Sequence, residues 1–167
     1  MSWMEFKQHI WPLKDRLYRL ALRLVNDRAE AEDVVQEVMI KLWRQGTDLA
    51  VIRNLEAWCL KLTKNQALDK LKGGYRKRKT NLTLVSDHQS PSPNPAQQAE
   101  TSDTLSHVHA LLQQLPEQHR ATLQLRDIEG LSYQEISEAL DMTLPQVKTN
   151  LFRARKALRE QLLRYEK

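Results

Sequence analysis

Residues 132–155 read SYQEISEALDMTLPQVKTNLFRAR, and this stretch decides the fold. Ser132 and Glu135 have the spacing of a capping box, which predicts a short helix that ends near Leu140. A second capping box starts at Thr143 and predicts a long helix, separated from the first by a two-residue turn. A short helix, a tight turn and a longer helix form the helix-turn-helix pattern.

The long helix has an apolar stripe and a basic face. Its stripe, predicted to be buried, consists of Val147, Leu151, Ala154, Leu158 and Leu162. Off the stripe lie Lys148, Thr149, Phe152, Arg153, Arg155 and Lys156. The second helix of this motif enters the major groove of DNA, where basic side chains reach guanines or phosphates and an aromatic ring touches a thymine methyl. We expect Arg155 and Lys156 to contact phosphates, which position a protein without specifying sequence. The alternative is an amphipathic helix with a solvated basic face.

A linker separates this region from the first part of the chain. Residues 86–102 read SDHQSPSPNPAQQAETS, with three prolines and no aliphatic residue larger than alanine, so nothing there offsets the entropy of ordering. We expect a module at 1–79, a linker at 80–104 and a second module at 105–167. A long loop within one domain is the alternative.

The first module reads as three helices. They are expected at 3–25 with a break at Pro12, at 29–44, and from the cap Asn54 to Lys72, where Gly73-Gly74 ends the last one. The inward face of the second comprises Ala31, Val34, Val35, Val38, Met39, Leu42 and Trp43. Its outward face comprises Asp33, Gln36, Glu37, Ile40 and Arg44. Ile40 is apolar on a face that should be wet.

The third helix carries a mixed stripe and leads into a basic run. The stripe is Trp58, Leu62, Asn65, Asp69 and Lys72, and the run is Arg76, Lys77, Arg78 and Lys79. An aromatic surface and an amide beside a phosphate-binding strip suit unpaired bases. A tryptophan at helical spacing is more often a core residue, so the pattern alone favours burial.

The composition favours an all-α fold of two small helical domains joined by a flexible linker. Only four glycines occur in 167 residues, and the net charge of +5 favours a polyanionic partner. Cys59 is the only cysteine and is expected to be buried and inert, which fits a reducing, cytoplasmic location without membrane insertion. The pair His107 and His109 lacks further ligands nearby, so we expect no metal and no cofactor.

Five segments of the chain, in collinear order, resemble the sigma factors of the sigma-70 family. Residues 31–43 (AEDVVQEVMIKLW) and 54–71 resemble region 2, and the segments 115–117, 131–136 and 147–155 resemble region 4. A short chain with these two regions is similar to the extracytoplasmic-function (ECF) group. The resemblance implies a non-enzymatic subunit that binds bacterial core RNA polymerase and promoter DNA, directs transcription initiation, and has an anti-sigma factor as a partner.

The resemblance also implies a role for each matched residue. Clamp helices of the polymerase would bind Asp33, Gln36, Glu37 and Ile40. The −10 element, with a flipped base, would contact Trp58, Leu62, Asn65, Lys72, Arg76, Lys77 and Arg78. The −35 element would be read by Lys148, Thr149, Phe152 and Arg153, with Arg155 and Lys156 on phosphates. Pro145 and Asn150 depart from the usual pattern, and Asn150 leaves one backbone contact open. The loop 45–53, which pockets the flipped base in relatives, does not match either, so the selected base stays open.

Two other functions fit parts of the pattern. A self-contained helix-turn-helix regulator would bind a two-fold symmetric duplex without polymerase. A helical adaptor would hold another protein, and its basic zones would be incidental. The acidic outward face favours the sigma factor. A further hypothesis is that the free modules pack together and hide their basic faces, since the acidic second helix lies near the basic third.

Overall fold

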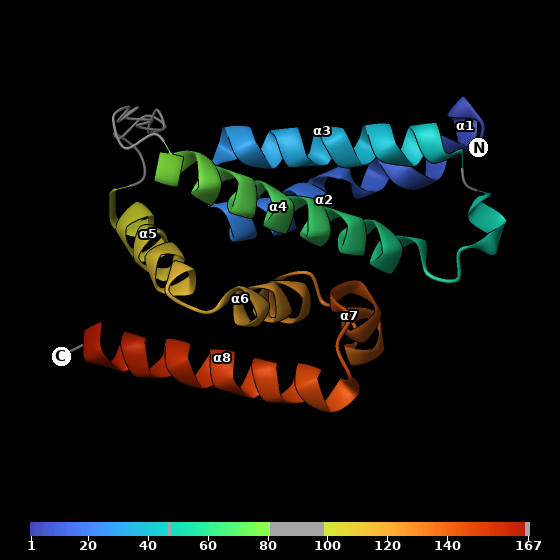
Figure 1. Cartoon of the computed structure of the whole chain (residues 1–167). Coiled ribbons are helices and arrows are strands. Elements are labelled where there is room, and N and C mark those ends of the chain that lie inside the picture. The colour runs from blue at the N-terminus through green and yellow to red at the C-terminus, as the bar shows by residue number, and fades with distance from the viewer. Residues whose placement is uncertain (47, 81–98, 166–167) are drawn as a thin grey trace.

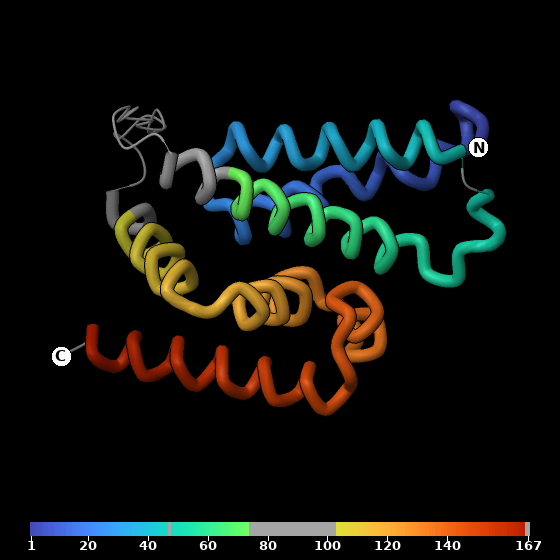
Figure 2. Tube along the Cα trace, in the orientation of Figure 1, coloured from blue at the N-terminus to red at the C-terminus, as the bar shows by residue number. Residues whose placement is uncertain are grey.

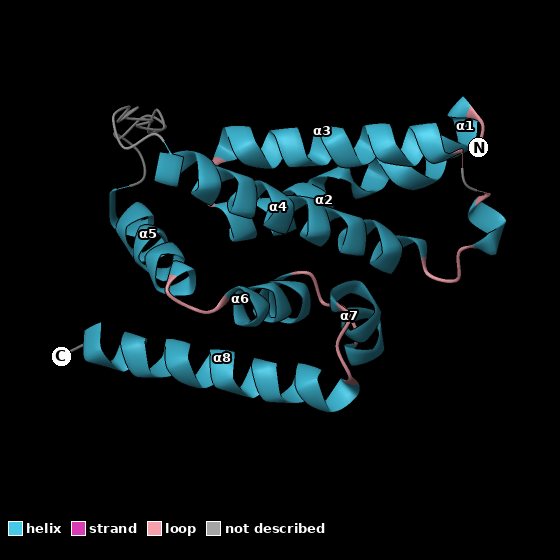
Figure 3. Cartoon of the chain, viewed as in Figure 1, coloured by secondary structure: helices cyan, strands magenta, loops and turns pink. Residues whose placement is uncertain are grey.

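The computed structural model describes residues 1–46, 48–80 and 99–165, with side chains described at 1–46, 48–73 and 103–165. Throughout these residues the secondary structure is helical, with loops between the helices (Figure 3). Helices α2, α3 and α4 form one layer, and α6, α7 and α8 form a second layer beneath α4 (Figure 1). The expected all-α class is confirmed.

The first layer begins with a broken helix. Its parts are α1 (Trp3–Glu5), a π-helical turn (Phe6–Ile10), a 3-10 turn (Trp11–Leu13) and α2 (Lys14–Val25). Pro12 lies in the 3-10 turn, where its missing N–H and its ring prevent a regular helix. Asn26 ends α2 in the left-handed region, with φ 53°. The predicted break at Pro12 is therefore confirmed.

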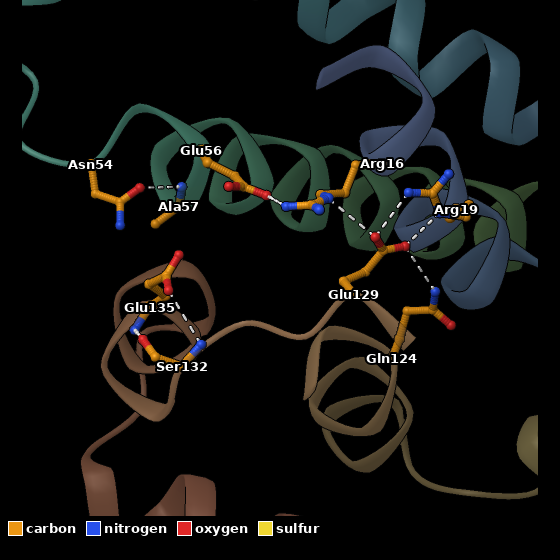
Figure 4. Close-up of polar contacts among 9 residues, drawn as sticks. All are labelled: Arg16, Arg19, Asn54, Glu56, Ala57, Gln124, Glu129, Ser132 and Glu135. Carbon is orange, nitrogen blue, oxygen red and sulfur yellow. Dashed lines mark hydrogen bonds and ion pairs between the residues drawn. The ribbon is translucent and has the colours of Figure 1, made fainter. Parts of the chain in front are cut away.

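Side chains cap the next two helices, and the cap at Asn54 is the predicted one. Asp27 caps α3 (Arg28–Gln45), since its Oδ1 accepts the Glu30 N–H at 2.9 Å. A 3-10 turn (Leu49–Val51) precedes α4 (Leu55–Thr80), which Asn54 caps by accepting the Ala57 N–H at 3.0 Å (Figure 4). Side-chain oxygens thus satisfy first-turn amides that have no partner inside the helix.

The second layer has the predicted helix-turn-helix. After α5 (Ala99–Gln113) come α6 (Glu117–Leu123), a π-helical turn (Gln124–Ile128), α7 (Tyr133–Leu140) and α8 (Leu144–Tyr165). The Ser132–Glu135 capping box is complete, with both reciprocal bonds present (Figure 4). Thr143 and Gln146 form the second one, at 3.3 and 2.9 Å. On α8, Val147, Leu151 and Ala154 are buried as expected, whereas Leu158 and Leu162 of the same predicted stripe are only half-buried.

One continuous core joins the two layers. We call α1 to α4 the first half of the chain and α5 to α8 the second half. Leu20, Val34 and Leu60 of the first half belong to the same buried cluster as Ile136 and Leu140 of the second half. Helix α4 packs on α7, and α2 packs on α6. The two predicted helical domains correspond to the two layers, and they pack against each other in this structure. The predicted linker lies mostly in residues 81–98, which are outside the described residues (Figure 2).

Three other expectations need correction. Helix α4 continues past Gly73 to Thr80, although Gly73-Gly74 was predicted to end it; each glycine costs a helix only about 1 kcal/mol relative to alanine. Helix α5 begins at Ala99, inside the segment assigned to the linker. Trp43 is 44% exposed rather than buried, and its ring packs edge-on against Trp3 and Phe6.

The shared core predicts that a cavity in α7 destabilises the first half as well. Ile136 is fully buried, so Ile136→Ala should lower the free energy of unfolding by about 2–5 kcal/mol. All four tryptophans lie between Trp3 and Trp58, in the first half. Denaturant titration followed by tryptophan fluorescence should therefore show an earlier midpoint. An unchanged midpoint would mean that the halves unfold independently, and Leu163→Ala, at a side chain 55% exposed, is the control.

Candidate nucleic-acid interface

The amino-terminal part of α8 presents an exposed surface that the sequence predicts to read DNA, called the reading face below. Lys148, Thr149, Phe152 and Arg153 are all exposed, and Phe152 is exposed over 68% of its surface. The buried stripe holds the opposite side of the helix against α6 and α7. An aromatic ring this exposed beside basic residues is open to contact with a partner. The structure thus brings the four predicted −35 residues onto one accessible surface.

The two residues predicted to bind phosphates differ in their surroundings. Arg155 donates two hydrogen bonds to the Asp127 carboxylate, from Nε at 3.0 Å and from Nη2 at 2.5 Å. This pair raises the pKa of Arg155 and leaves its guanidinium partly neutralised. Lys156 is exposed on the same helix. A DNA phosphate would have to compete with Asp127 for Arg155.

This difference predicts unequal effects of two alanine substitutions. Lys156→Ala should weaken duplex binding and reduce the salt dependence by about one phosphate contact. Arg155→Ala should have a smaller effect on both the affinity and its salt dependence. The Arg155 guanidinium must give up its hydrogen bonds to Asp127 before it can bind a phosphate, so its net contribution to binding is smaller. Duplex affinity measured against salt concentration separates the two. A larger loss of salt dependence in Arg155→Ala would show that the ion pair opens on DNA.

The predicted stripe on α4 lies at the surface. Asn65, Asp69 and Lys72 are exposed, whereas Trp58 and Leu62 are half-buried against the core. Trp58 therefore packs against the core, as its helical spacing favours, and stays partly accessible, while its contact with a base stays a prediction. The side chains of Arg76, Lys77 and Arg78 lie outside the described residues, so the predicted basic run is placed only as the last turns of α4.

The flank of α4 that faces α7 is basic. Lys61 Nζ lies 2.9 Å from Asp141 Oδ1, and Lys64 Nζ donates to the Leu140 carbonyl at 3.2 Å. Burial lowers the pKa of Lys64, while Asp141 opposes that shift. Two cations beside the predicted −10 surface are thus held by the second half of the chain.

The predicted outward face of α3 is exposed, as expected. Asp33 and Glu37 both lie near Lys70 of α4, at 3.3 and 3.9 Å. Both carboxylates remain largely exposed, at 60% and 47% of the side chain. Ile40 is 49% exposed, so the odd apolar residue does face solvent.

A groove beside this face was missing from the sequence prediction. It has a volume of about 660 Å³ between α2 and α3, and Trp11, Tyr18, Met39 and Ile40 supply its apolar walls. Trp11 and Tyr18 are seven residues apart, on a side of the first helices other than their buried face. That spacing was a usable signal for a second apolar stripe. The groove makes Ile40 part of a larger apolar surface.

Charged side chains connect the halves at a second place. The Glu129 side chain is only 3% exposed; its carboxylate lies 3.1 Å from Arg16 Nε and accepts bonds from Arg19 at 2.5 and 2.9 Å (Figure 4). Arg16 also pairs with Glu56. These contacts, first of all the Arg19 hydrogen bonds, lower the pKa of Glu129. Buried and doubly paired, Glu129 joins the second half to α2.

The hypothesis of mutually hidden basic faces is only partly supported. The halves do pack together, and Lys61 and Lys64 are covered by the end of α7. The acidic helix is not what covers them, however, and the reading face of α8 stays exposed around Phe152. Packing of the two halves, the closed arrangement, fixes the α4 stripe and the α8 reading face relative to each other and leaves both accessible.

The cysteine and the two histidines that the sequence singles out each pack against or contact other side chains. Cys59 is fully buried, and burial raises its pKa to about 12, so it is inert as expected. His107 stacks on Tyr165, and His109 Nδ1 lies 2.9 Å from Arg23 Nη1. The described residues contain no cluster of three metal-ligating side chains. No described helix has an apolar run long enough to cross a bilayer.

Two family models match the sequence. The model for Sigma-70 region 2 matches residues 12–78, and the model for Sigma-70, region 4 matches residues 106–158. The first match contains α2 to α4, with the acidic face and the α4 stripe. The second contains the helix-turn-helix and its reading face.

Several curated proteins are similar over most of the chain. The ECF RNA polymerase sigma factor SigE of Mycolicibacterium smegmatis is 36% identical over 98% of this chain and 63% of its own length, so the chain spans less than two thirds of that relative. SigW of Bacillus subtilis is 27% identical, over 89% of this chain and 84% of its own. The RNA polymerase sigma-H factor of Pseudomonas aeruginosa is 31% identical, over 86% and 78%.

Two solved structures share the fold. The sigma factor RpoE, in complex with the anti-sigma factor NepR from Bartonella quintana, has a TM-score of 0.75 at 22% identity over 95% of this chain and 96% of its own. CnrH, in complex with the cytosolic domain of CnrY, has a TM-score of 0.69 at 21% identity over 96% and 89%. At these identities the likeness shows a common arrangement of helices.

Proposed function

The chain belongs to the sigma-70 family and is of the ECF type, and on this premise we propose that it binds core RNA polymerase and directs promoter-specific transcription initiation. The observation that supports this most strongly is the presence of two separate DNA-suited surfaces and one acidic, groove-lined surface on a single chain. A protein that only recognises duplex DNA needs a DNA-binding surface but no acidic surface beside an apolar groove.

The polymerase would bind the outward face of α3. Asp33, Gln36 and Glu37 offer charged and polar contacts, and Ile40 with the neighbouring groove offers an apolar anchor. An apolar centre with a polar rim is the usual composition of a protein interface. These contacts would place the subunit on the clamp helices of the polymerase.

Promoter DNA would then meet two surfaces. The α8 face reads the −35 duplex, because Lys148 and Arg153 can reach base edges or phosphates and Phe152 can contact a thymine methyl. The α4 stripe holds the unpaired −10 strand, since the Trp58 ring offers a stacking surface and Asn65 an amide for a base edge. Binding of the single strand stabilises the melted state relative to the duplex, which promotes strand separation.

The subunit itself would catalyse no reaction and would act with the polymerase in the cytoplasm. Of the two solved structures, RpoE is in complex with the anti-sigma factor NepR, and CnrH is in complex with the cytosolic domain of CnrY. We propose that this chain also has such a partner, whose binding would compete with the polymerase. The proposed functional division is 1–79, 80–104 and 105–167, with the start of α5 counted in the joining segment.

Mapping of RNA start sites on genomic DNA, with the full chain and bacterial core polymerase, tests the function. A sigma factor produces new starts that share a two-part upstream sequence. A self-contained regulator produces none and binds a symmetric duplex by itself, and a helical adaptor does neither. Core polymerase without the added chain is the control.

A further inference from the structure

A second pocket lies at the seam between the halves, away from the proposed polymerase and DNA surfaces. It has a volume of about 600 Å³, within the range of small-molecule sites. The end of α2, the start of α3, α5 and the π-helical turn after α6 form its walls. Its polar lining includes Arg19, Arg23, Arg28, Ser106, His109 and Gln113.

The charge of this lining is positive and incompletely neutralised. Arg19 is bonded to the buried Glu129 carboxylate, so its charge is matched. Asp27 is the acid in the lining, and one of its oxygens caps α3. Arg23 and Arg28 therefore contribute a net positive charge to the pocket.

Arg23 is half-buried and has neutral partners. Its Nε donates to Gln124 Oε1 at 2.9 Å, and its Nη1 lies 2.9 Å from His109 Nδ1. Within the described residues no carboxylate pairs with it. Burial, and then the nearby Arg120, lower the pKa of Arg23. A half-buried guanidinium without a counter-charge is unfavourable unless an anion joins it.

A second guanidinium approaches from the other half of the chain. Arg120 of α6 donates from Nη1 to Gln113 Oε1, and Gln113 donates from Nε2 to the Arg23 carbonyl at 3.2 Å. The Nε of Arg120 is buried and has no hydrogen-bond partner among the described residues. Gln113, which lines the pocket, thus bridges two repelling arginines, and an anion beside it would weaken that repulsion across the seam.

An apolar wall completes the pocket. Leu22, Ala110 and Ile128 line it, and the Ile128 side chain is exposed over 53% of its surface. Apolar side chains next to cationic donors suit a ligand with a flat ring and a phosphate group. Arginine binds phosphate oxygens with paired, charge-assisted hydrogen bonds.

We propose that this pocket binds a phosphate-bearing small molecule of nucleotide size, with the phosphates on Arg23 and Arg28 and the ring on the Leu22–Ile128 wall. The ligand would contact both halves, so its binding stabilises the closed, folded chain by mass action. The site goes beyond the proposed function, and neither polymerase binding nor promoter reading depends on it.

Thermal unfolding of the full chain with ATP or inorganic pyrophosphate, at fixed ionic strength, tests the site. We expect a saturable rise in Tm, with ATP acting at a lower concentration than pyrophosphate. Arg23→Gln and the exposed Arg28→Gln should each raise the midpoint concentration at least about tenfold. Arg153→Gln, the matched change on the DNA-reading face, should leave it unaltered.

Three results would overturn the proposal. Absence of a saturable shift with either probe excludes the site. A shift that is lost in Arg153→Gln but kept in Arg28→Gln places the polyphosphate on the DNA surface instead. Equal midpoints for ATP and pyrophosphate exclude the ring contact with the apolar wall. Arg28→Gln keeps the test valid if Arg23→Gln fails to fold.

Discussion

Replacement of both Asp33 and Glu37 by arginine will weaken binding to core RNA polymerase by about 2–4 kcal/mol, or roughly 30- to 700-fold. The reason is that each carboxylate on the exposed face of α3 would pair with a basic group of the polymerase, and each arginine would be repelled by it. Fluorescence anisotropy of the labelled chain, titrated with core enzyme, measures the loss.

The same double variant should still fold. Asp33 and Glu37 face Lys70, but their side chains are 60% and 47% exposed, and such surface pairs contribute at most about 1 kcal/mol. Its Tm should therefore fall only slightly. Glu160→Arg, an exposed charge reversal on α8, is the matched control and should bind polymerase as the unaltered chain does. Equal affinity of the double variant and the unaltered chain would place the polymerase elsewhere.

The second large effect is expected at Glu129. Glu129→Gln removes the negative charge that Arg16 and Arg19 share, and leaves two cations beside an amide. Breaking a fully buried pair costs about 3–5 kcal/mol, but the arginine side chains are 35% and 47% exposed, so about 1–3 kcal/mol is expected here. The equilibrium between closed and open chains should shift about 5- to 150-fold towards open.

Energy transfer between two dyes can follow this opening. Cysteines introduced at the exposed positions Gln45 and Arg164 carry the dyes, and the native Cys59 stays unlabelled because it is buried with a raised pKa. The exchanged pair Arg19→Glu with Glu129→Arg should restore part of the closed population. Unchanged energy transfer in Glu129→Gln would show that the apolar core alone holds the halves together.

Acid should open the chain in the same assay. Burial, and then Arg23, lower the pKa of His109 below its usual 6.5, and the arginine contacts lower the pKa of Glu129 below its usual 4.5. In the open chain both groups return to ordinary values, so opening takes up protons and becomes more favourable as pH falls. We expect a first loss of closure below about pH 6.5 from His109 and a second below about pH 4.5 from Glu129. His109→Gln should remove only the first.

Local signals in the sequence were enough for the capped helix starts and for the exposed side of α8. Capping at Asn54, Ser132 and Thr143 depends on residues three positions apart, and the structure confirms all three. The α8 stripe depends only on helical periodicity, so the sides bearing Leu151 and Phe152 could be assigned without tertiary information.

The arrangement of the halves could not be read in this way. Glu129 and Arg19 are 110 residues apart, and no local pattern relates them. Apolar seam residues such as Leu140 fit a core within their own half equally well, so their pattern gives no sign of a shared core. Trp43 was expected inside because of its periodicity, but the broken first helix leaves it a half-exposed place beside Phe6.

One chain is expected to read two DNA elements with two separate surfaces. Paired changes in the protein and the promoter test this most directly. At a promoter found by start-site mapping, RNA synthesis is measured for single base changes in each element, with the unaltered chain, Phe152→Ala and Asn65→Ala. Phe152→Ala should lose discrimination only at the upstream element, and Asn65→Ala only at the downstream one, by about 1–3 kcal/mol at the affected base. Equal discrimination by all three proteins at both elements would contradict the assignment of these surfaces.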